Sequence, residues 1–245
     1  MDIHVSPSLR TPDRWASEVK FDVSPEIAAA VASWAGGAMT PDIHGGDSAD
    51  GSYRIRTLYL DTAGRDVFLR SPGYKLSKFR VRSYLPGQET FLEQKKKRGC
   101  RVQKFRTAVD VQDFEAVVAG SMPSDHSGQW FRSEVERLQL LPSCLVEYRR
   151  FAFNSMSESG PMRLTIDDQI FARDAAGWDL GADGPRVEVM PGRCVLEIKF
   201  PEVLPAAFKE MIREHRLLAP GGSKYRFGHA ALVSAPVEER RCQNS

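Results

Sequence analysis

Basic side chains alternate along three consecutive strand-like segments of this 245-residue chain: Lys-Phe-Arg-Val-Arg at 78–82, Glu-Gln-Lys-Lys-Lys at 93–97 and Lys-Phe-Arg at 104–106. In a strand, alternate side chains share a face, so the charges of each segment point the same way. Like charges on neighbouring strands repel each other. Such a face is tolerated only where water or a polyanion neutralises it.

The same pattern recurs further along the chain, where strand-like segments add Arg150, Arg163 and Lys199 and a C-terminal segment adds Lys224. For a single strand, the simplest interpretation is a solvated outer face. Recurrence favours a different arrangement, because a small barrel lined with charge cannot be a dry core. We therefore expect a wet channel for a strongly anionic ligand, with Arg binding phosphate oxygens in pairs and Lys acting as a point charge.

Carboxylates lie among these cations, each two positions before a Lys and on the same strand face. Two interpretations stay open. One is an ion pair, which contributes little if it is exposed. The other is a carboxylate that holds a divalent metal bridging phosphates, since hard cations take oxygen ligands and often keep several waters. The pairs are Glu18 with Lys20, Glu93 with Lys95, and Glu197 with Lys199.

Two further motifs have both a structural and a functional interpretation. Asp167 shares a predicted strand face with Arg163 and Thr165. It is there either as the partner of a structural ion pair or in a ligand-binding role. Gly-Gly-Ser-Lys-Tyr at 221–225 is similar to a flexible anion-binding loop or is a simple turn, and it lacks the spacing and the preceding strand of a P-loop. The five histidines are scattered, so the sequence supports neither a zinc site nor a histidine relay.

Composition limits the class of protein. The chain has 34 basic and 32 acidic residues, so it is not a generally basic nucleic-acid coat. The basic run 95–98 lacks the interleaved aromatic residues of single-strand binders, and we expect no nucleic-acid partner. The four cysteines form no CxxC pair, which is typical of reduced thiols. No signal peptide is recognisable and the longest apolar stretch, 27–39, is too short to span a bilayer, so we expect a soluble cytoplasmic protein.

Periodicity predicts one α+β domain over 15–230, with an N-terminal extension at 1–14 and a C-terminal tail at 231–245. About eight mostly antiparallel strands with helices at the connections favour a closed or nearly closed barrel, because closure removes exposed edges. Loops are expected at 36–52 and 175–185, and a hairpin turn at Pro86-Gly87. Strands are expected at 15–22, 53–61, 74–84, 89–97, 101–109, 143–153, 161–173 and 193–200, and helices at 25–34, 110–119, 128–139 and 205–216.

Nine short motifs follow one another along residues 15 to about 230. They are Glu-x-Lys-Phe at 18–21, Leu-Tyr-Leu-Asp-Thr at 58–62, Lys-Phe-Arg-Val-Arg-Ser-Tyr at 78–84, Phe-Leu-Glu-Gln-Lys-Lys-Lys at 91–97, Lys-Phe-Arg at 104–106, Tyr-Arg-Arg at 148–150, Arg-Leu-Thr-Ile-Asp at 163–167, Leu-Glu-Ile-Lys-Phe at 196–200 and Ser-Lys-Tyr at 223–225. In this order they resemble the catalytic domain of the vacuolar transporter chaperone (VTC) polyphosphate polymerases, within the triphosphate tunnel metalloenzyme (CYTH-like) superfamily. Each motif is short, but nine in one order are specific.

The resemblance implies a tunnel of antiparallel strands that binds ATP or another triphosphate. With Mn²⁺ or Mg²⁺, the γ-phosphate would be transferred onto a growing inorganic polyphosphate chain. The resemblance implies catalytic roles for Lys95, Arg150 and Glu197, with Glu197 holding the metal. Ser223 and Lys224 would close on the phosphate end. The implied phosphate-binding set is Lys20, Arg80, Arg82, Lys95, Lys97, Lys104, Arg106, Arg150, Arg163, Lys199, Ser223 and Lys224.

Two departures from the family pattern bear on the activity. Related triphosphatases and class IV cyclases begin Glu-x-Glu-x-Lys, whereas Ala16 stands at the first Glu here, which favours the polymerase branch. The eukaryotic polymerases also carry an inositol-phosphate-sensing domain and membrane helices, neither of which this sequence contains, so we expect a stand-alone form. Two alternatives stay open: a metal-dependent tripolyphosphatase or nucleoside triphosphatase of the same fold, and a non-catalytic polyphosphate-binding module.

Overall fold

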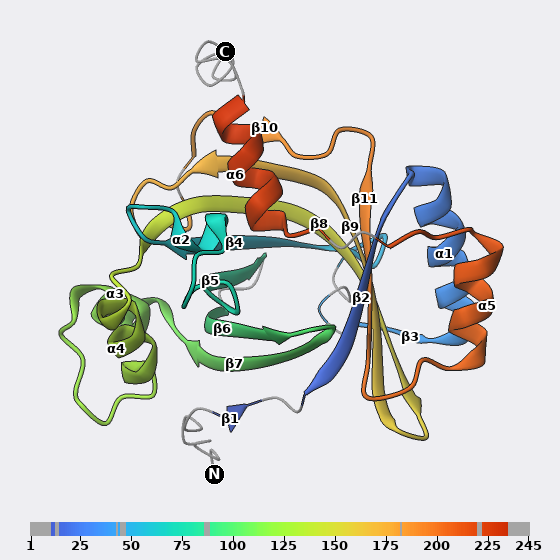
Figure 1. Ribbon diagram of the computed structural model, residues 1–245, viewed down its shortest axis with the longest axis horizontal. Helices are drawn as coiled ribbons and strands as arrows, with labels where there is room; N and C mark the ends of the chain where they lie inside the picture. Colours follow the sequence, from blue (N-terminus) through green and yellow to red (C-terminus); the bar gives the residue numbers. More distant parts are fainter. Residues whose placement is uncertain are drawn as a thin grey trace.

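The computed structural model describes residues 11–12, 15–42, 44, 48–85, 89–181, 183–219 and 222–234. Within these ranges the chain forms one sheet of eleven strands and six helices (Figure 1). The strands are β1 (Thr11–Pro12), β2 (Ala16–Val23), β3 (Thr40–Pro41), β4 (Tyr53–Asp61), β5 (Ser77–Leu85), β6 (Thr90–Arg98), β7 (Arg101–Val109), β8 (Leu141–Ser157), β9 (Gly160–Asp174), β10 (Val187–Glu188) and β11 (Cys194–Phe200). The helices are α1 (Pro25–Ala38), α2 (Asp66–Leu69), α3 (Val111–Ala119), α4 (Gln129–Arg137), α5 (Ala206–Glu214) and α6 (Lys224–Ser234).

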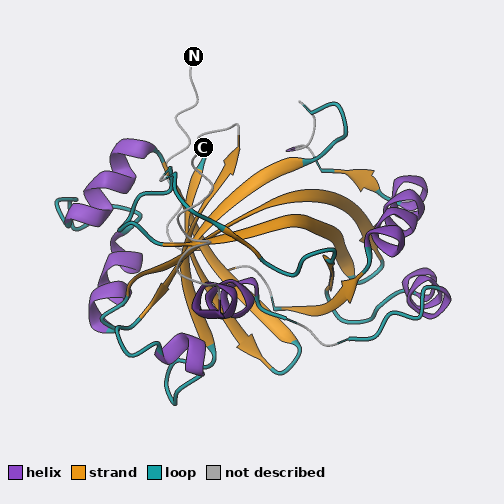
Figure 2. Ribbon diagram, turned by 90° about the horizontal axis from the view of Figure 1, so that it is seen from above, coloured by secondary structure: helices purple, strands orange, loops and turns teal. Residues whose placement is uncertain are grey.

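Eight of the strands close into a ring. Their order is β9, β11, β2, β7, β6, β5, β4 and β8, and the two ends of this series are joined because β8 also pairs with β9. Every pairing is antiparallel, including the long hairpin of β8 and β9. The predicted α+β fold with an antiparallel barrel of about eight strands is confirmed. Figure 2 shows helices on the outside of the strands, with α3 and α4 at one end of the strand assembly, α1 and α5 at the other, and α6 between them.

The register of β5, β6 and β7 sets the charged side chains in rows across the sheet. Opposed residues share a face, so the alternation along each strand becomes a charged inner surface. The other face is apolar: Phe79 is buried there, with its ring 6.0 Å from that of Phe131 in α4. The predicted sharing of one face by the alternate charges is therefore confirmed. The two central rows are Lys78–Lys95–Lys104 and Arg80–Glu93–Arg106.

The outer face of β2, β9 and β11 is covered by α1 and α5, which lie side by side in Figure 1. Leu196 and Ile198 of β11 are fully buried beneath them. The rings of Trp34 in α1 and Phe208 in α5 are 5.0 Å apart, edge to face. Apolar burial of this kind is the main favourable contribution to folding, and here it lies outside the barrel. The interior is thereby left available for polar groups.

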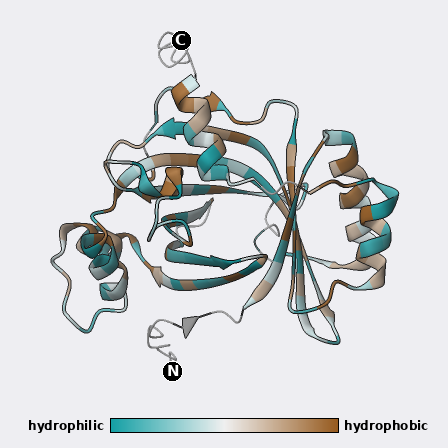
Figure 3. Cartoon of the chain, viewed as in Figure 1, coloured by the Kyte–Doolittle hydropathy of each residue, from teal (hydrophilic) through white to brown (hydrophobic). Residues whose placement is uncertain are grey.

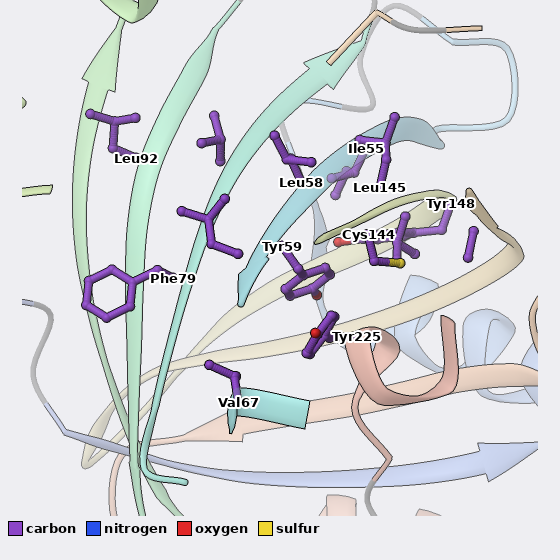
Figure 4. Packing of buried hydrophobic residues seen from close by; sticks show 14 of the residues in the cluster. Ile55, Leu58, Tyr59, Val67, Phe79, Leu92, Cys144, Leu145, Tyr148 and Tyr225 are labelled. Atoms are coloured by element: carbon purple, nitrogen blue, oxygen red, sulfur yellow. The ribbon is translucent and has the colours of Figure 1, made fainter. Parts of the chain in front are cut away.

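Helix α6 packs closely on β8 and β9. A Cβ atom on Gly228 would lie 3.1 Å from Ala172 Cβ and 3.2 Å from Val146 Cγ2, so this approach depends on glycine. Figure 4 shows Tyr225 of α6 beside Tyr59 of β4, and their ring centroids are 5.2 Å apart. This packing fixes the first residue of the helix, Lys224, at the barrel interior.

Helices extend into two segments that were expected to be loops. Helix α1 runs on through Gly36 and Gly37 to Ala38, because Ala35 is fully buried and the Met39 N–H bonds to its carbonyl oxygen at 2.8 Å. Neither glycine contacts other atoms at its Cβ position, so both lie on the open side of the helix. In the segment expected to be an anion-binding loop or a turn, Gly222 and Ser223 precede α6, which begins at Lys224.

Several expectations fall on residues outside the described ranges. These are the hairpin turn at Pro86-Gly87, Gly221, most of the N-terminal extension at 1–14 and the C-terminal tail beyond Ser234. The hairpin itself is present, because β5 and β6 pair in register on both sides of the turn. None of the helices in the described part of the chain is both long enough and apolar enough to cross a bilayer.

Candidate functional site

The barrel encloses a cavity of about 750 Å³ whose charged lining comes mainly from β2, β5, β6, β8 and β11 and from α6. Figure 3 shows the hydrophilic character of β6, one of the strands that contribute to this lining. Its cationic lining is Lys20, Arg70, Lys75, Lys78, Arg80, Arg82, Lys95, Lys97, Arg150, Lys199, Lys224 and Arg226, and its carboxylates are Glu18 and Glu197. The cations are organised into clusters around a few buried carboxylates.

The first cluster joins Glu18 and Glu197 to three lysines. In register, Glu197 lies opposite Lys20 and Glu18 opposite Lys199, so the two carboxylates are diagonal neighbours on one face. Lys20 Nζ lies 2.7 Å from Glu197 Oε2 and 3.4 Å from Glu18 Oε1. Lys95 Nζ reaches Glu18 from β6 at 2.7 and 2.8 Å.

The titration of the two carboxylates reflects this crowding. Burial and the neighbouring Glu197 both raise the pKa of Glu18, but the lysines outweigh them and the pKa is lowered. Burial also raises the pKa of Glu197, and attraction to Lys20 and Lys95 holds it well below its usual value. Both carboxylates are therefore ionised at neutral pH.

The second cluster surrounds Glu93, which is fully buried. Arg80 donates from Nε and Nη2 to Glu93 Oε2 at 2.7 and 2.6 Å. Burial raises the pKa of Glu93, but the surrounding cations lower it well below its usual value. Four cations thus share one carboxylate. Besides Arg80 they are Arg82 at 3.9 Å, Lys104 at 3.7 Å and Arg106 at 3.5 Å from its oxygens.

The third cluster is centred on Asp167 of β9, also fully buried. Arg150 donates to both of its carboxylate oxygens, at 2.6 and 2.8 Å, and Lys224 Nζ lies 2.5 Å away. Burial raises the pKa of Asp167, but Arg150 and Lys224 outweigh it and lower the pKa to about 2. Of the two interpretations of Asp167, the structure shows the ion pair. Through this pair Asp167 orients the guanidinium of Arg150 and the first residue of α6 at the cavity.

Lys78 links β5 to the start of α6, because its Nζ donates to Ser223 Oγ at 2.6 Å. Burial lowers its pKa to about 7, and repulsion from Lys20 and Arg80 adds to the effect. A lysine with such a pKa is partly neutral at pH 7, and an anion bound beside it restores its charge.

We expect proton uptake by Lys78 on triphosphate binding. A ligand that binds the charged ammonium form of Lys78 loses affinity as the pH rises from about 6 to about 8. Deprotonation of Lys78 alone accounts for a loss of up to about tenfold. Lys78→Arg keeps its charge over that range, so its affinity should fall less. Calorimetric measurement of tripolyphosphate affinity against pH for wild type and Lys78→Arg tests this. The ligand's own protonation affects both proteins equally, so the difference between them reports on Lys78. Equal slopes for the two proteins would contradict it.

The cavity brings together most of the sequence-predicted residues. Those that line it are Lys20, Arg80, Arg82, Lys95, Lys97, Arg150, Glu197, Lys199, Ser223 and Lys224. Lys104 and Arg106 do not line the cavity. Their side chains lie beside the buried Glu93 carboxylate instead. Arg163 is not part of the lining either. Its guanidinium contacts the Asp42 carboxylate and Asn154 Oδ1, so it lies in a separate polar group at the ends of β8 and β9.

Sequence reasoning missed several lining residues. Lys78 lies on the predicted cationic face but was not assigned to the phosphate-binding set, although its alternation with Arg80 was a sufficient signal. Arg226 and Lys75 carry no such signal, because they belong to a helix and a turn whose positions depend on tertiary packing. The role of Glu93 as the counterion of a row of arginines also required the register of three strands.

The donor set fits one hard divalent cation. Glu18 and Glu197 supply carboxylate oxygens on one wall of the cavity, and such cations often take only one or two protein carboxylates together with phosphate oxygens and waters. Among the described residues there is no cluster of three or more His, Cys, Asp or Glu side chains that would hold a metal by itself. The residues therefore suit a metal that arrives with a phosphate ligand.

A comparison with protein families matches residues 16–233 to the family described as VTC domain. The chain belongs to the VTC domain family. A search of curated proteins found no match. Among solved structures, this VTC domain is similar to a putative adenylate cyclase from Bacillus halodurans, with 14% identity and a TM-score of 0.52, covering 88% of this chain and 98% of that one.

It is also similar to a putative adenylyl cyclase from Hippeastrum that is described as having a dominant triphosphatase activity. The identity is 16% and the TM-score 0.52, with 89% of this chain and 96% of that chain covered. At such low identity these likenesses show the fold alone. The VTC domain therefore has the triphosphate tunnel fold, as the sequence predicted.

Proposed function

We propose that this VTC domain is a polyphosphate polymerase that transfers the γ-phosphate of ATP onto a growing inorganic polyphosphate chain. The observation that carries the proposal is the surplus of cations inside a closed barrel. Four surround Glu93, three surround Glu18 and Glu197, and two surround Asp167. A polyanion of extended shape would neutralise these cations, since unpaired buried charge is costly.

The reaction needs little beyond positioning and charge. A terminal phosphate oxygen of the acceptor chain is already ionised, so it attacks the γ-phosphorus directly, and the bond from that phosphorus to the β,γ-bridging oxygen breaks. Negative charge on the transferred group and on the ADP leaving group is balanced by fixed cations. Arg80, Arg82 and Arg150 present guanidinium N–H groups to phosphate oxygens, and Lys95 supplies a point charge.

Glu197 and Glu18 would hold the divalent cation, Mn²⁺ or Mg²⁺, which supplies further charge neutralisation at the phosphates when bound. Their lysine neighbours keep both carboxylates ionised and oriented toward the cavity. Lys20, at 2.7 Å from Glu197, fixes that side chain in the wall.

A triphosphatase of the same fold is the competing function, with water in place of the acceptor chain. Ala16 lies at the start of β2, opposite Val102, where the related hydrolases place a carboxylate. A smaller set of metal ligands supports the polymerase over the hydrolase. A polyphosphate-binding module without catalysis is the second alternative.

The test is product analysis after incubation of the purified protein with ATP and Mn²⁺. We expect polymer that migrates as long-chain polyphosphate, together with ADP. Orthophosphate as the only phosphate product would establish the hydrolase instead. Binding of polyphosphate without consumption of ATP would leave the non-catalytic module as the function.

A further inference from the structure

A second cavity lies on the outside of the barrel, apart from the tunnel. Its volume is about 720 Å³, which is in the range of pockets that bind small organic ligands. Its walls are β4, β5 and β6, helix α3 and the segment 178–181. Among the described residues, none lines both this outer cavity and the tunnel.

Helix α3 presents an apolar stripe to the outer cavity. Val111, Phe114 and Val118 line it, and their spacing of three and four residues places them on one face of the helix. Val117 is buried in the core from another face. Val111 remains 50% exposed, so the described part of the chain leaves this end of the stripe uncovered. The helix therefore has more apolar surface than its packing on the barrel uses.

The segment 178–181 supplies the facing apolar wall. The ring centroid of Trp178 lies 6.5 Å from that of Phe114, edge to face. Both side chains are half-buried and line the cavity, together with Leu180. Aromatic side chains that line a pocket and keep part of their surface exposed suit contact with a planar apolar ligand.

The floor of the outer cavity is a row of polar side chains across the sheet. Arg56 lies opposite Ser83, and Ser83 lies opposite Thr90. Ser83 is 8% exposed and Thr90 6% exposed, yet neither hydroxyl has a hydrogen-bond partner among the described residues. A buried hydroxyl without a partner costs free energy. The two hydroxyls therefore suit a ligand that carries hydrogen-bonding groups at its inner end.

Arg56 gives this floor its charge. Its Nε donates to Glu147 Oε2 at 2.7 Å and its Nη1 to the Leu180 carbonyl oxygen at 3.3 Å, which fixes the guanidinium beside the segment 178–181. Glu147 is also shared by Arg54, at 3.0 Å, and by Arg186, at 3.8 Å. Three guanidinium groups thus meet one carboxylate, and the surplus of positive charge favours an anion at the floor.

The rim of the outer cavity has the opposite charge. Glu115 and Asp179 are the carboxylates of the lining, and both are exposed. They repel an anionic group at the rim, whereas Arg56 attracts it at the floor. A ligand with one anionic end and one apolar end is therefore oriented with the anion inward.

We propose that the outer cavity binds a small aromatic carboxylate, with its ring against Phe114 and Trp178 and its carboxylate at Arg56, Ser83 and Thr90. The apolar stripe of α3 and the aromatic wall select the ring, and the floor selects the anion. The inference does not depend on the proposed function, because no residue of the outer cavity takes part in the tunnel chemistry.

The test uses naphthalene-2-carboxylate as the probe and its neutral carboxamide as the comparison. Each is titrated into the protein, with and without saturating tripolyphosphate, while the indole N–H signal of Trp178 is followed by NMR. Trp178→Phe assigns that signal. We expect one site for the carboxylate with a dissociation constant of about 1 mM or tighter, a shift of the Trp178 signal, and no displacement by tripolyphosphate.

Two variants separate the charge from the apolar walls. Arg56→Gln should weaken binding of the carboxylate about tenfold and change binding of the carboxamide less than about twofold. Phe114→Ala should weaken both ligands about tenfold. The matched controls are Arg137→Gln, which removes an exposed ion-pair partner on α4, and Leu218→Ala, which truncates an apolar side chain that is 80% exposed. Both controls should bind the two probes as wild type does.

Several results would overturn the inference. Displacement of the carboxylate by tripolyphosphate would place the probe in the tunnel, and an unshifted Trp178 signal would place it elsewhere. Equal affinities of wild type for the acid and the amide would remove the anion site. Arg56→Lys keeps a cation and should recover part of the affinity for the acid; no recovery would show that Arg56 only holds the segment 178–181. A dimer in sedimentation that Phe114→Ala dissociates would assign the stripe to contact between copies instead.

Discussion

Glu197→Gln should lower the rate of ATP consumption by about 10³-fold, because it removes the carboxylate charge that holds the divalent cation at the phosphates. The amide keeps the size of the side chain and still accepts a hydrogen bond from Lys20, now 2.7 Å from Glu197. Tripolyphosphate affinity without metal should therefore stay within about threefold of wild type. Turnover measured under saturating ATP and Mn²⁺, beside calorimetric binding, tests both parts.

The matched control for this variant is Glu136→Gln, which removes a carboxylate from an exposed pair with Arg132 on α4. Its turnover should equal that of wild type. Full activity of Glu197→Gln would contradict the metal assignment. A parallel loss of activity and of metal-free tripolyphosphate binding would show that Glu197 acts on the fold of the cavity instead.

Glu93→Gln should have the largest effect on stability. The substitution leaves Arg80 and its three cationic neighbours inside the barrel without a counterion, and breaking a buried ion pair by removing one partner costs about 3–5 kcal/mol. Urea unfolding of the variant should show that loss in the free energy of unfolding. Tripolyphosphate should recover more stability in the variant than in wild type, because a bound anion replaces the missing charge.

The difference in the free energy of unfolding between wild type and Glu93→Gln should depend on pH in a defined direction. The pKa of Glu93 is lowered well below its ordinary value of 4.5 in the folded protein. Its ionised form therefore stabilises the fold at all pH values above about 4.5, and the contribution is lost as the pH falls toward the folded pKa. The gap between wild type and Glu93→Gln should shrink on acidification below about pH 4.5. Glu134→Gln, which removes an exposed partner of Arg137, should cost less than about 0.5 kcal/mol.

The strands of the barrel were predictable because their signal is local. Alternation at Lys78, Arg80 and Arg82 is read directly from the sequence, and the pleat of a strand converts it into a shared face. The expected range of β7, 101–109, matches the structure. Closure of the barrel was predictable from the number of antiparallel strands, because an open sheet would leave two long edge strands exposed.

The contacts within the site were not predictable in the same way. Lys95 meets Glu18 across 77 positions of the chain and Lys78 meets Ser223 across 145, so these partners depend on strand order and on side-chain reach. The local signal at 221–225, with two glycines, favoured a loop. Gly222 and Ser223 are outside a helix as that signal suggests, but α6 begins at Lys224, and Tyr225 and Gly228 pack from it against β4, β8 and β9.

The central claim is that the inward-facing cations form one site for a chain of phosphoryl groups. Calorimetric titration of tripolyphosphate into wild type and Arg82→Met tests it most directly, with Arg213→Met on the outer helix α5 as the control. The account predicts one ligand per protein, an affinity that the control retains, and a loss of about tenfold to a hundredfold for Arg82→Met, the value of a charge-assisted hydrogen bond. Equal affinity in all three proteins, or several weak equivalents of ligand, would contradict it.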